Sequence, residues 1–352
     1  MSKVNQQMIA DRLGLSRATV SRCFTNHAGI NPVTRAKVFQ VAAEFGYTHM
    51  EGRTPPKNEA AKKQLGFTVL ICSESEEYFH GDYISPGEEI LAGVSEYAQA
   101  HDIKVDINLI PPSVTDVDDQ SFQKIKSLRS RAGRGVLLIY PFPTAVIDQL
   151  ALKFPLVSLV DQDEHIPIDC VDVDHGSGIS LAIDRLVAAG HRRIGFYTRD
   201  YPIEASWSFH RYGAFLEKMA RLKLPVSSKD ILGVFPSKRL EVSDSIDLAA
   251  ERTEDGVTAW VCAADHQAYD LISGFQKRGL IVPDDVSITG FDGIVNNETG
   301  VELTTIKIPY REIGMSGAER LASRLRKRFA GKQRVYISGE LKNGDTIGEI
   351  PV

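Results

Sequence analysis

The amino-acid sequence predicts an all-α helix-turn-helix headpiece followed by an α/β core of two doubly wound lobes. Short amphipathic segments with the period of α-helices follow one another between residues 6 and 46. From Leu65 onward, apolar β-prone runs alternate with amphipathic helical segments in two series, which is typical of parallel sheets with helices on both faces. A chain of 352 residues also exceeds what one hydrophobic core fills.

Three helices are predicted for the headpiece. The first covers residues 6–13 and ends at Gly14, since glycine readily takes the left-handed conformation of a helix stop. Ser16 can cap the second helix, and Asn31 can cap a third helix that ends at Gly46. The residues expected to form their shared core are Ile9, Leu13, Val20, Cys23, Phe24, Val38, Val41, Ala42 and Phe45.

The opposite face of the second helix has the side chains of a DNA-contacting surface. Ala18, Ser21, Arg22 and Thr25 are small or cationic groups that fit a major groove, and Arg17 stands at the exposed N-terminal end. Residues 1–64 hold ten Lys/Arg and four Asp/Glu, a net charge of +6, whereas residues 65–352 hold 31 and 42, a net charge of −11. A basic head on an acidic body attracts phosphate to the head, which argues against the alternative of an ordinary helical subdomain with solvated arginines.

Composition also divides the chain into domains. Residues 1–49 form the predicted DNA-binding domain, and residues 50–64 form a polar, proline-marked hinge or linker. Residues 65–352 form a two-lobed domain, with an N-lobe of about residues 65–160 and 309–335 and a C-lobe of about residues 161–308 and 336–352. A small ligand is expected between the lobes, since ligands of open α/β sheets bind outside the carboxyl ends of the strands.

The elements of the two lobes are predicted from periodicity. Predicted strands cover residues 65–72, 105–110, 135–140, 156–160, 193–197, 231–235, 259–263 and 287–291. Predicted helices cover residues 88–100, 121–131, 144–153, 177–189, 207–220, 241–251 and 267–278. Residues 335–341 are expected to form a last strand that returns to the body.

Other classes of protein are disfavoured. The chain has no apolar run long enough to cross a bilayer and no secretion signal at its start, so we expect a cytoplasmic protein. Its four cysteines are scattered and are expected to be reduced core thiols, and no metal or cofactor is expected. Dinucleotide-binding, phosphate-loop and nucleophile-elbow motifs are absent, which argues against an enzyme. His175 and His191 are expected to satisfy backbone groups.

Motifs spread along the chain carry a family resemblance. They are Ser16–Arg22, Ala189–Ile194, Thr258–Asp265, Arg278–Ser287, Gly290–Asp292 and Leu303–Ile306. In this order, and over essentially the whole chain, they resemble the lactose-repressor and galactose-repressor (LacI/GalR) family of bacterial transcription regulators. The resemblance implies a headpiece joined to a periplasmic-binding-protein-like core, and a homodimer that reads pseudo-palindromic double-stranded operator DNA. It also implies repression controlled by a small effector, with a sugar or sugar derivative as the expected ligand.

The resemblance assigns roles within the headpiece. Arg17, Ala18 and Arg22 match the positions that set base preference, and the fork of Arg17 suits the O6 and N7 acceptors of guanine. Secondary groove or backbone contacts are expected from Gln7, Ser21 and Thr25, and phosphate contacts from Thr19 and Thr34. Ser16 is equally consistent with a helix cap and with a DNA contact.

The resemblance also places an effector site. Arg211 matches an arginine that family members commonly use, and its fork suits paired hydroxyls or a carboxylate. Asp292 and Asp265 match further polar contacts, and Asp161 is expected to face the cleft as a third acid. Aromatic side chains expected to stack on the ligand are Phe235, Trp207, Tyr78 and Phe79. The alternative is that the acids cap helices or accept from backbone amides, and Asp265 fits both interpretations equally.

The hinge departs from the family pattern. Met50, Arg53 and Pro56 stand where family members often carry an Asn, an Ala and the Leu that wedges into the minor groove. The displaced candidate Asn58, Ala61 and Leu65 has the wrong final spacing. The C-terminal tail has no apolar heptads, so a dimer is expected rather than a coiled-coil tetramer. A sugar receptor or a carbohydrate-active enzyme without a regulatory role is the alternative function.

Overall fold

The computed structural model describes residues 4–25, 27, 29–45, 47, 65–73, 85–129, 134–161, 168–199, 206–234, 241–295, 300–326 and 331–350. The chain divides into two compact units. The first combines residues 1–172 with 310–335, and the second combines residues 173–309 with 336–352.

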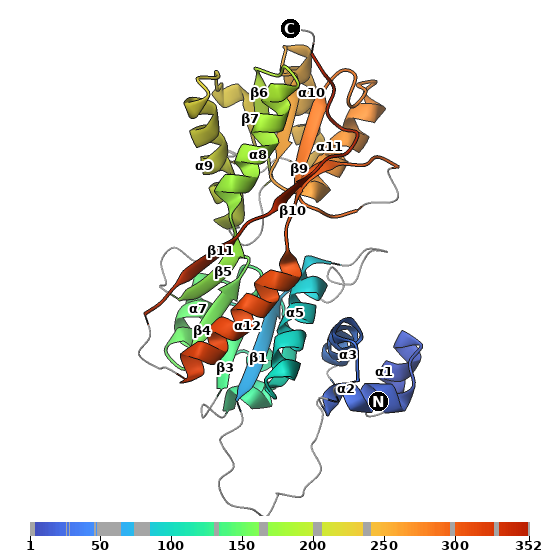
Figure 1. Cartoon of the computed structure of the whole chain (residues 1–352), viewed down its shortest axis with the longest axis vertical. Helices are drawn as coiled ribbons and strands as arrows, with labels where there is room; N and C mark the ends of the chain where they lie inside the picture. The colour runs from blue at the N-terminus through green and yellow to red at the C-terminus, as the bar shows by residue number, and fades with distance from the viewer. Residues whose placement is uncertain are drawn as a thin grey trace, which may run out of the picture. The chain divides into compact units, whose positions relative to one another are not determined.

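The headpiece contains α1 (Gln6–Leu13), α2 (Arg17–Phe24) and α3 (Pro32–Glu44), drawn in blue in Figure 1. The Asn5 side chain caps α1 by accepting from two backbone amides, and Gly14, at φ +63°, ends it. The fully buried core residues are Ile9, Ala10, Val20, Cys23 and Val38, with Val41 and Ala42 nearly so. Leu13, Phe24 and Phe45, expected inside this core, are half-buried and pack against it, because a domain of three short helices is too small to enclose every large apolar side chain.

The sheet of the first unit has the order β11-β5-β4-β3-β1-β2. Its strands are β1 (Gly66–Cys72), β2 (Lys104–Ile110), β3 (Arg134–Ile139), β4 (Leu156–Leu159), β5 (Asp169–Val173) and β11 (Arg334–Ile337). The pairs that join β2, β1, β3, β4 and β5 are parallel. The helices of this lobe are α5 (Pro86–Ala100), α6 (Gln120–Gln123), the 3₁₀ helix η1 (Lys126–Arg129), α7 (Thr144–Ala151) and α12 (Tyr310–Arg326).

Helices α5 and α12 lie side by side across one face of this sheet (Figure 1). Glycines allow their backbones to approach closely. A Cβ atom built on Gly93 would overlap the carbonyl oxygen of Arg311 and lie 2.9 Å from the amide nitrogen of Met315. A Cβ atom on Gly314 would likewise overlap the carbonyl oxygen of Ile90. The first lobe is therefore held together by a helix contact between segments more than two hundred residues apart in sequence.

The sheet of the second unit has the order β12-β10-β9-β8-β6-β7. Its strands are β6 (Ile194–Tyr197), β7 (Ile231–Leu232), β8 (Ala259–Cys262), β9 (Ser287–Asp292), β10 (Thr304–Lys307) and β12 (Glu340–Lys342). Only β12, among the described pairs, is antiparallel to its neighbour. The helices are α8 (His175–Ala188), α9 (Ser206–Arg221), α10 (Val242–Glu254) and α11 (Asp265–Lys277), with the short 3₁₀ helix η2 (Ser228–Asp230). Helix α8 contacts α9, and α10 contacts α11.

Three expected elements differ from the structure. The helix expected over residues 121–131 is instead the short α6 and η1. The backbone amides of Ile125 and Leu128 donate to carbonyls three residues back, as in a 3₁₀ helix, and the apolar residues Phe122, Ile125 and Leu128 recur at the same step. The strand expected over residues 231–235 ends at Leu232, where Gly233 turns at φ +80° beneath the carbonyl of Thr198. The single last strand is two strands, β11 and β12, which belong to different sheets. No helix in the described part of the chain is long and apolar enough to span a membrane.

Candidate nucleic-acid interface and ligand-contact cluster

The exposed face of α2 presents the predicted base-contacting residues. Arg17, Ala18 and Arg22 are exposed, while Val20 and Cys23 anchor the opposite face with no exposed surface. The Ser16 hydroxyl accepts from the Thr19 amide at 3.1 Å and lies 2.9 Å from the Thr19 hydroxyl. Ser16 is thus the N-cap of α2. This bond fixes the first turn of the helix, and hence the direction in which its exposed face points.

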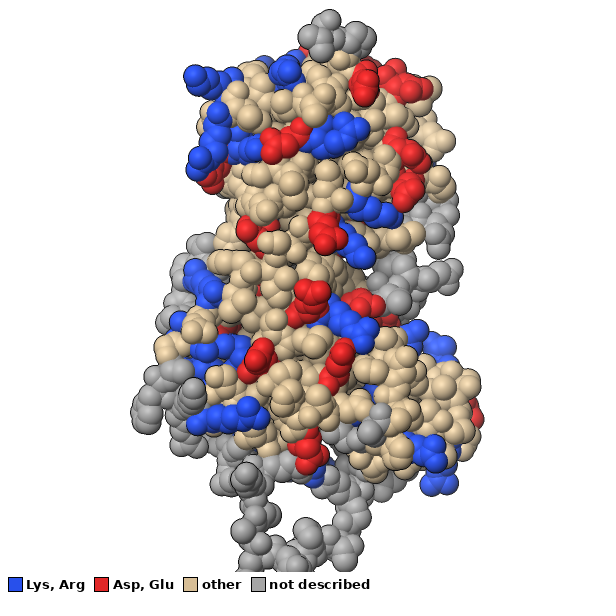
Figure 2. Space-filling model, in the orientation of Figure 1, with Lys and Arg blue, Asp and Glu red and all other residues tan. Residues whose placement is uncertain are grey.

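The secondary contact residues are already engaged within the headpiece. The Gln7 amide donates to Asp11 at 2.7 Å, and the Thr25 hydroxyl donates to the Ser21 carbonyl at 3.2 Å. Ser21 and Thr34 are half-buried. The side chains of Arg17 and Arg22 are longer and are not used in hydrogen bonds among the described residues. They can therefore extend further from this surface than the secondary contact residues. Figure 2 shows basic side chains predominating on the visible face of the headpiece and both signs of charge mixed over the lobes.

The sequence did not predict that an arginine of α3 is buried against the headpiece core. Arg35 on α3 is 1% exposed, and its Nη2 donates to the carbonyl oxygen of His27 at 2.7 Å. This bond ties the loop after α2 to α3. Burial lowers the pKa of Arg35 and raises the pKa of the Cys23 thiol to about 11, so Cys23 stays a neutral core thiol. An arginine with ordinary helical spacing gives no sequence signal of burial.

Arg211 is the centre of a polar cluster in the second unit. Its side chain comes from α9 and is 4% exposed. Nε donates to His175 Nδ1 at 3.2 Å, and Nη1 donates to the carbonyl oxygen of Ala263 and to Asp292 Oδ1, the latter at 3.3 Å. The guanidinium carbon lies 3.9 Å from the ring centroid of Phe291 and 4.7 Å from that of Trp207. Aromatic faces and hydrogen bonds together fix the plane of the guanidinium.

The cluster forms at the carboxyl ends of parallel strands. Ala263 directly follows β8, and Asp292 is the last residue of β9. His175 opens α8, which contacts α9, the helix that carries Arg211. The loops after the neighbouring parallel strands β8 and β9 converge on one edge of the sheet of the second unit, which brings residues from distant parts of the sequence into contact there.

Asp265 supports this cluster from inside the lobe. Its side chain has no exposed surface, and its two oxygens accept from the Thr305 hydroxyl at 2.5 Å and from the Ile294 amide at 2.6 Å. The Asp265 amide donates to Asp292 Oδ2 at 3.4 Å. Burial, and next the neighbouring Asp292 carboxylate, raise the pKa of Asp265 to about 7. Asp265 therefore orients Asp292 and the loop after β9, while the half-buried Asp292 is the acid nearer to solvent.

His175 contacts the Arg211 side chain, an interaction that the sequence did not predict. Because Arg211 Nε donates to Nδ1, the neutral ring carries its proton on Nε2. The ring lies 5.7 Å from that of His210 and 6.0 Å from that of Phe291. His191, by contrast, contacts the Gly348 carbonyl at 3.1 Å as expected, besides the Thr258 hydroxyl at 3.0 Å.

A second polar chain anchors the helices that carry the cluster. Gln267 Nε2 on α11 donates to the Thr198 hydroxyl at 3.3 Å, and that hydroxyl lies 2.8 Å from Ser208 Oγ on α9. Ser208 precedes Arg211 by about one helical turn. Thr198 is a polar residue directly after β6, and this position was a sequence signal for the hydrogen-bonded series that the sequence analysis did not predict.

The other predicted effector residues are distributed as follows. Trp207 lies against Arg211 and is half-buried. Asp161 belongs to the first unit, where it follows β4 and is 5% exposed. Phe235, Tyr78 and Phe79 lie outside the described residues. The four cysteines are free and buried, and the described residues contain no group of His, Cys, Asp and Glu arranged to hold a metal ion.

A capped helix with exposed arginines, carried on a body of two parallel-sheet lobes, defines a class of DNA-binding regulators. Comparison with known proteins makes the class specific. Residues 7–49 match the family model "Bacterial regulatory proteins, lacI family", and residues 183–347 match a periplasmic binding protein-like domain. The arabinose metabolism transcriptional repressor of Geobacillus stearothermophilus is 32% identical over 294 residues, which cover 80% of this chain and 75% of that protein. The chain belongs to the lacI family of bacterial regulatory proteins.

Solved structures share the fold. The regulator CelR in its cellobiose complex has a TM-score of 0.64 at 18% identity and covers 98% of this chain and 100% of its own. The lac repressor dimer bound to operator and the anti-inducer ONPF has a TM-score of 0.62 at 21% identity, with coverages of 98% and 99%. At such identities the likeness establishes the fold alone.

Proposed function

We propose that the chain is a sequence-specific transcriptional repressor that binds operator DNA as a homodimer and is controlled by a small polyhydroxylated effector. The observation that carries the proposal is the α2 surface, where Arg17, Ala18 and Arg22 are exposed on a helix that is capped by Ser16 and anchored by buried Val20 and Cys23. The regulatory role is supported by the arabinose repressor, which matches most of the chain. Binding of DNA by a dimer is supported by the lac repressor complex.

The proposed DNA contacts follow from side-chain chemistry. Arg17 and Arg22 present planar forks that suit guanine O6 and N7 in the major groove, and the methyl group of Ala18 suits a thymine methyl. Thr19 and Thr34 are proposed as phosphate contacts that set register, with Gln7, Ser21 and Thr25 at the margin of the interface. A dimer would place two α2 helices in half-sites of a pseudo-palindromic operator about one helical turn apart.

The proposed effector site is the Arg211 cluster. Arg211 uses Nε and Nη1 within the lobe, which leaves Nη2 to donate to ligand hydroxyls. Asp292 accepts hydrogen bonds from ligand hydroxyls, Asp265 holds Asp292 in place, and Trp207 offers an apolar face to a sugar ring. Asp161 is proposed as the contribution of the other lobe. A sugar is supported by the cellobiose bound to CelR.

Control is proposed to operate by population shift. An effector that binds one arrangement of the lobes more tightly changes how the dimer presents its two headpieces, and hence the affinity for the operator. The segment that would transmit this change, residues 50–64, lies outside the described residues.

Operator binding tests the first part of the proposal. A duplex selected by the wild-type chain from a random library is titrated at several salt concentrations against Arg17→Ala, Arg22→Ala and the exposed C-lobe control Lys277→Ala. Loss of a base-contacting arginine should weaken binding by about ten- to a hundredfold and relax sequence preference at one position of each half-site. Unchanged affinity and salt dependence in both arginine variants would remove α2 from the interface.

Calorimetry with a panel of neutral sugars tests the second part. Arg211→Met should abolish the heat of binding, whereas Arg252→Met should not, since Arg252 forms its ion pair with Asp255 at 2.8 Å on the surface of the same lobe. The relatives named above are regulators, and a purely regulatory role without catalysis is part of the proposal. Turnover of a bound sugar, or sugar binding without any DNA binding, would favour the alternative enzyme or receptor.

A further inference from the structure

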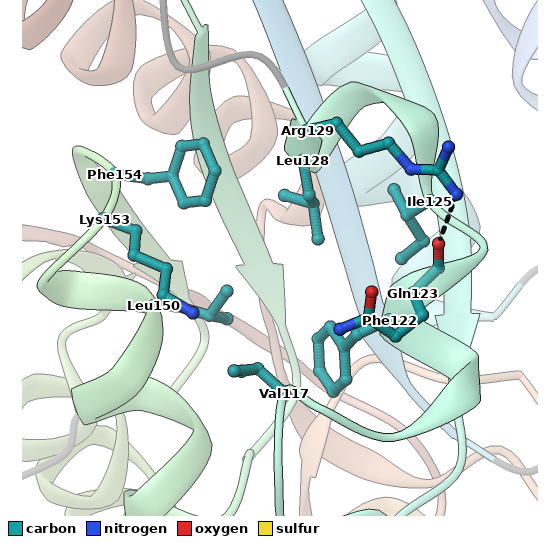
Figure 3. A pocket seen from close by; sticks show the side chains of 9 residues that line it. All are labelled: Val117, Phe122, Gln123, Ile125, Leu128, Arg129, Leu150, Lys153 and Phe154. Carbon is teal, nitrogen blue, oxygen red and sulfur yellow. Dashed lines mark hydrogen bonds between the residues drawn. The ribbon is translucent and has the colours of Figure 1, made fainter.

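The first lobe contains a pocket remote from the edge where its strands end. The pocket lies between the α6–η1 segment and the C-terminal end of α7 (Figure 3). Segment η1 leads into the start of β3, and the end of α7 leads into the start of β4. The pocket therefore lies toward the amino ends of these strands, whereas ligands of open α/β sheets bind at the carboxyl ends.

The interior of the pocket is apolar and small. Its apolar lining consists of Val117, Phe122, Ile125, Leu128, Leu150 and Phe154, all of them buried except the half-buried Leu128. The cavity volume is about 100 Å³. This is smaller than the usual site for a drug-sized ligand, and it limits the occupant of the interior to one aromatic ring or one short branched chain.

The walls of the pocket are tied together by hydrogen bonds. The Val117 amide donates to Gln149 Oε1 of α7 at 3.2 Å, which joins the loop before α6 to the opposite wall. Asp119 caps α6 by accepting from the Ser121 amide at 2.7 Å. Such bonds preform the hollow in the unliganded chain, so little ordering entropy would be lost on binding.

The charged groups around the mouth are cations. Besides the exposed Gln123, the polar lining residues are the exposed Arg129 and Lys153, and no acidic residue lines the pocket. Neither cation forms an ion pair with any carboxylate of the described residues. Arg129 donates one of its five N–H groups to the Gln123 carbonyl at 2.9 Å. Figure 3 shows Arg129 across the pocket from Lys153. The Leu150 carbonyl, which could repel an anion, already accepts from two backbone amides at 2.9 and 2.8 Å.

We propose that this pocket is a second ligand site that binds a small amphipathic monocarboxylate. An aromatic ring or short branched alkyl group fills the apolar interior, and the carboxylate lies at the mouth, where it accepts from Lys153 and Arg129. A neutral sugar would leave its hydroxyls unpaired against six apolar side chains, and a purely apolar molecule would not use the two cations. The site lies in the first unit, and the Arg211 cluster lies in the second, so the two proposals stand separately.

The test uses the full chain with phenylacetate and its neutral analogue phenylacetamide, measured by ligand-observed NMR and calorimetry. Phenylacetate should bind, and phenylacetamide should bind about tenfold more weakly or worse, because it cannot form the charge-assisted bonds. Lys153→Gln and Arg129→Gln should each weaken phenylacetate about tenfold, while the exposed C-lobe control Lys229→Gln should not. Leu128→Trp should fill the hollow and abolish binding, with circular dichroism checking that the lobe remains folded.

Several results would overturn the proposal. Equal binding of the amide and the acid would remove the role of the cations, and full binding by Leu128→Trp would remove the pocket. Loss of phenylacetate binding in Arg211→Met would place the acid at the other cluster, whereas loss of sugar binding alone in that variant leaves both proposals intact. Binding of a peptide with one Phe among glutamates, without binding of phenylacetate, would identify the pocket as a protein-docking site instead.

Discussion

The contact between α5 and α12 makes a sharp prediction about Gly93→Ala. The added Cβ atom would overlap the Arg311 carbonyl oxygen and approach the Met315 amide nitrogen to 2.9 Å. Both obstacles are backbone atoms, which cannot move aside by a change of rotamer, so the two helices must separate. Overpacking of this kind costs about 1–3 kcal/mol, and alanine recovers about 1 kcal/mol through its higher helix propensity. Since the overlap is with backbone, we take the upper end of the cost and expect a net loss of about 2 kcal/mol in the free energy of unfolding.

Gly213→Ala is the matched control on α9. Gly213 is exposed, and a Cβ atom there meets nothing within 4 Å. Only the propensity effect remains, so this variant should be more stable than wild type by about 0.5–1 kcal/mol.

Urea unfolding followed by two probes separates these effects. Both tryptophans, Trp207 and Trp260, lie in the second unit, so their fluorescence reports that lobe, while far-ultraviolet circular dichroism reports the whole chain. Gly93→Ala should lower the midpoint of the dichroism transition, and Gly213→Ala should raise the midpoint of fluorescence. If Gly93→Ala unfolds at the same or a higher urea concentration than wild type by dichroism, the inferred backbone contact is wrong.

Three further predictions concern buried charge and capping. Asp169→Asn should cost about 3 kcal/mol or more, because the 2%-exposed carboxylate accepts from Arg320 at 2.6 Å and from Arg324 at 3.1 Å, and asparagine removes the negative charge that balances these two cations; an unchanged dichroism midpoint would refute this. Asp265→Asn should flatten the pH dependence of stability. The native pKa of about 7 exceeds the ordinary 3.8, so between these values only the native state binds the proton, and wild-type stability should fall by a few kcal/mol as pH rises from about 4 to about 7. Tryptophan fluorescence in urea at several pH values checks the slope, and a wild type without it contradicts the assignment. Ser16→Ala should lower the free energy of unfolding of the headpiece by about 1 kcal/mol and speed amide hydrogen exchange in the first turn of α2. Unaltered exchange there would show that Ser16 does not cap the helix.

Local patterns predicted most elements of this fold. The period of the apolar residues predicted α1, α2 and α3. Strands β1, β3 and β4 are buried along their length, apart from Arg134 at the start of β3, and such nearly continuous apolar runs are typical of parallel sheets. The pattern was ambiguous over residues 121–131, since a three-residue apolar spacing suits an α-helix and a 3₁₀ helix alike. The division of residues 334–342 between two sheets depends on pairing with β5 and β10, which no local pattern encodes.

The sequence predicted some residues of the candidate sites and not others, for a physical reason. Arg211 and Asp292 were found through motifs and do form an ion pair. The bond from Arg211 to His175 and the support of Asp265 by Thr305 join residues about 36 and 40 positions apart, and they depend on how strand ends converge. The pocket beside α7 was missed because its lining residues look like ordinary core positions of separate segments. A hollow arises from what the packing leaves unfilled, which a sequence pattern does not record.

Each of the two units is built from two separate segments of the chain, and this affects the order in which the units can fold during synthesis. The first lobe lacks α12 and β11 until the ribosome has passed residue 337, and until then Leu321 cannot cover Gly135, nor can Leu159 meet Gly317. The second lobe waits for β12 in the same stretch. Both lobes are thus completed almost together, once residue 342 has been synthesised, with apolar surface of the first exposed throughout synthesis of the second. A nascent chain of this design depends on protection from aggregation until these elements have been synthesised, and expression of the first lobe alone requires a rejoined segment rather than a simple truncation.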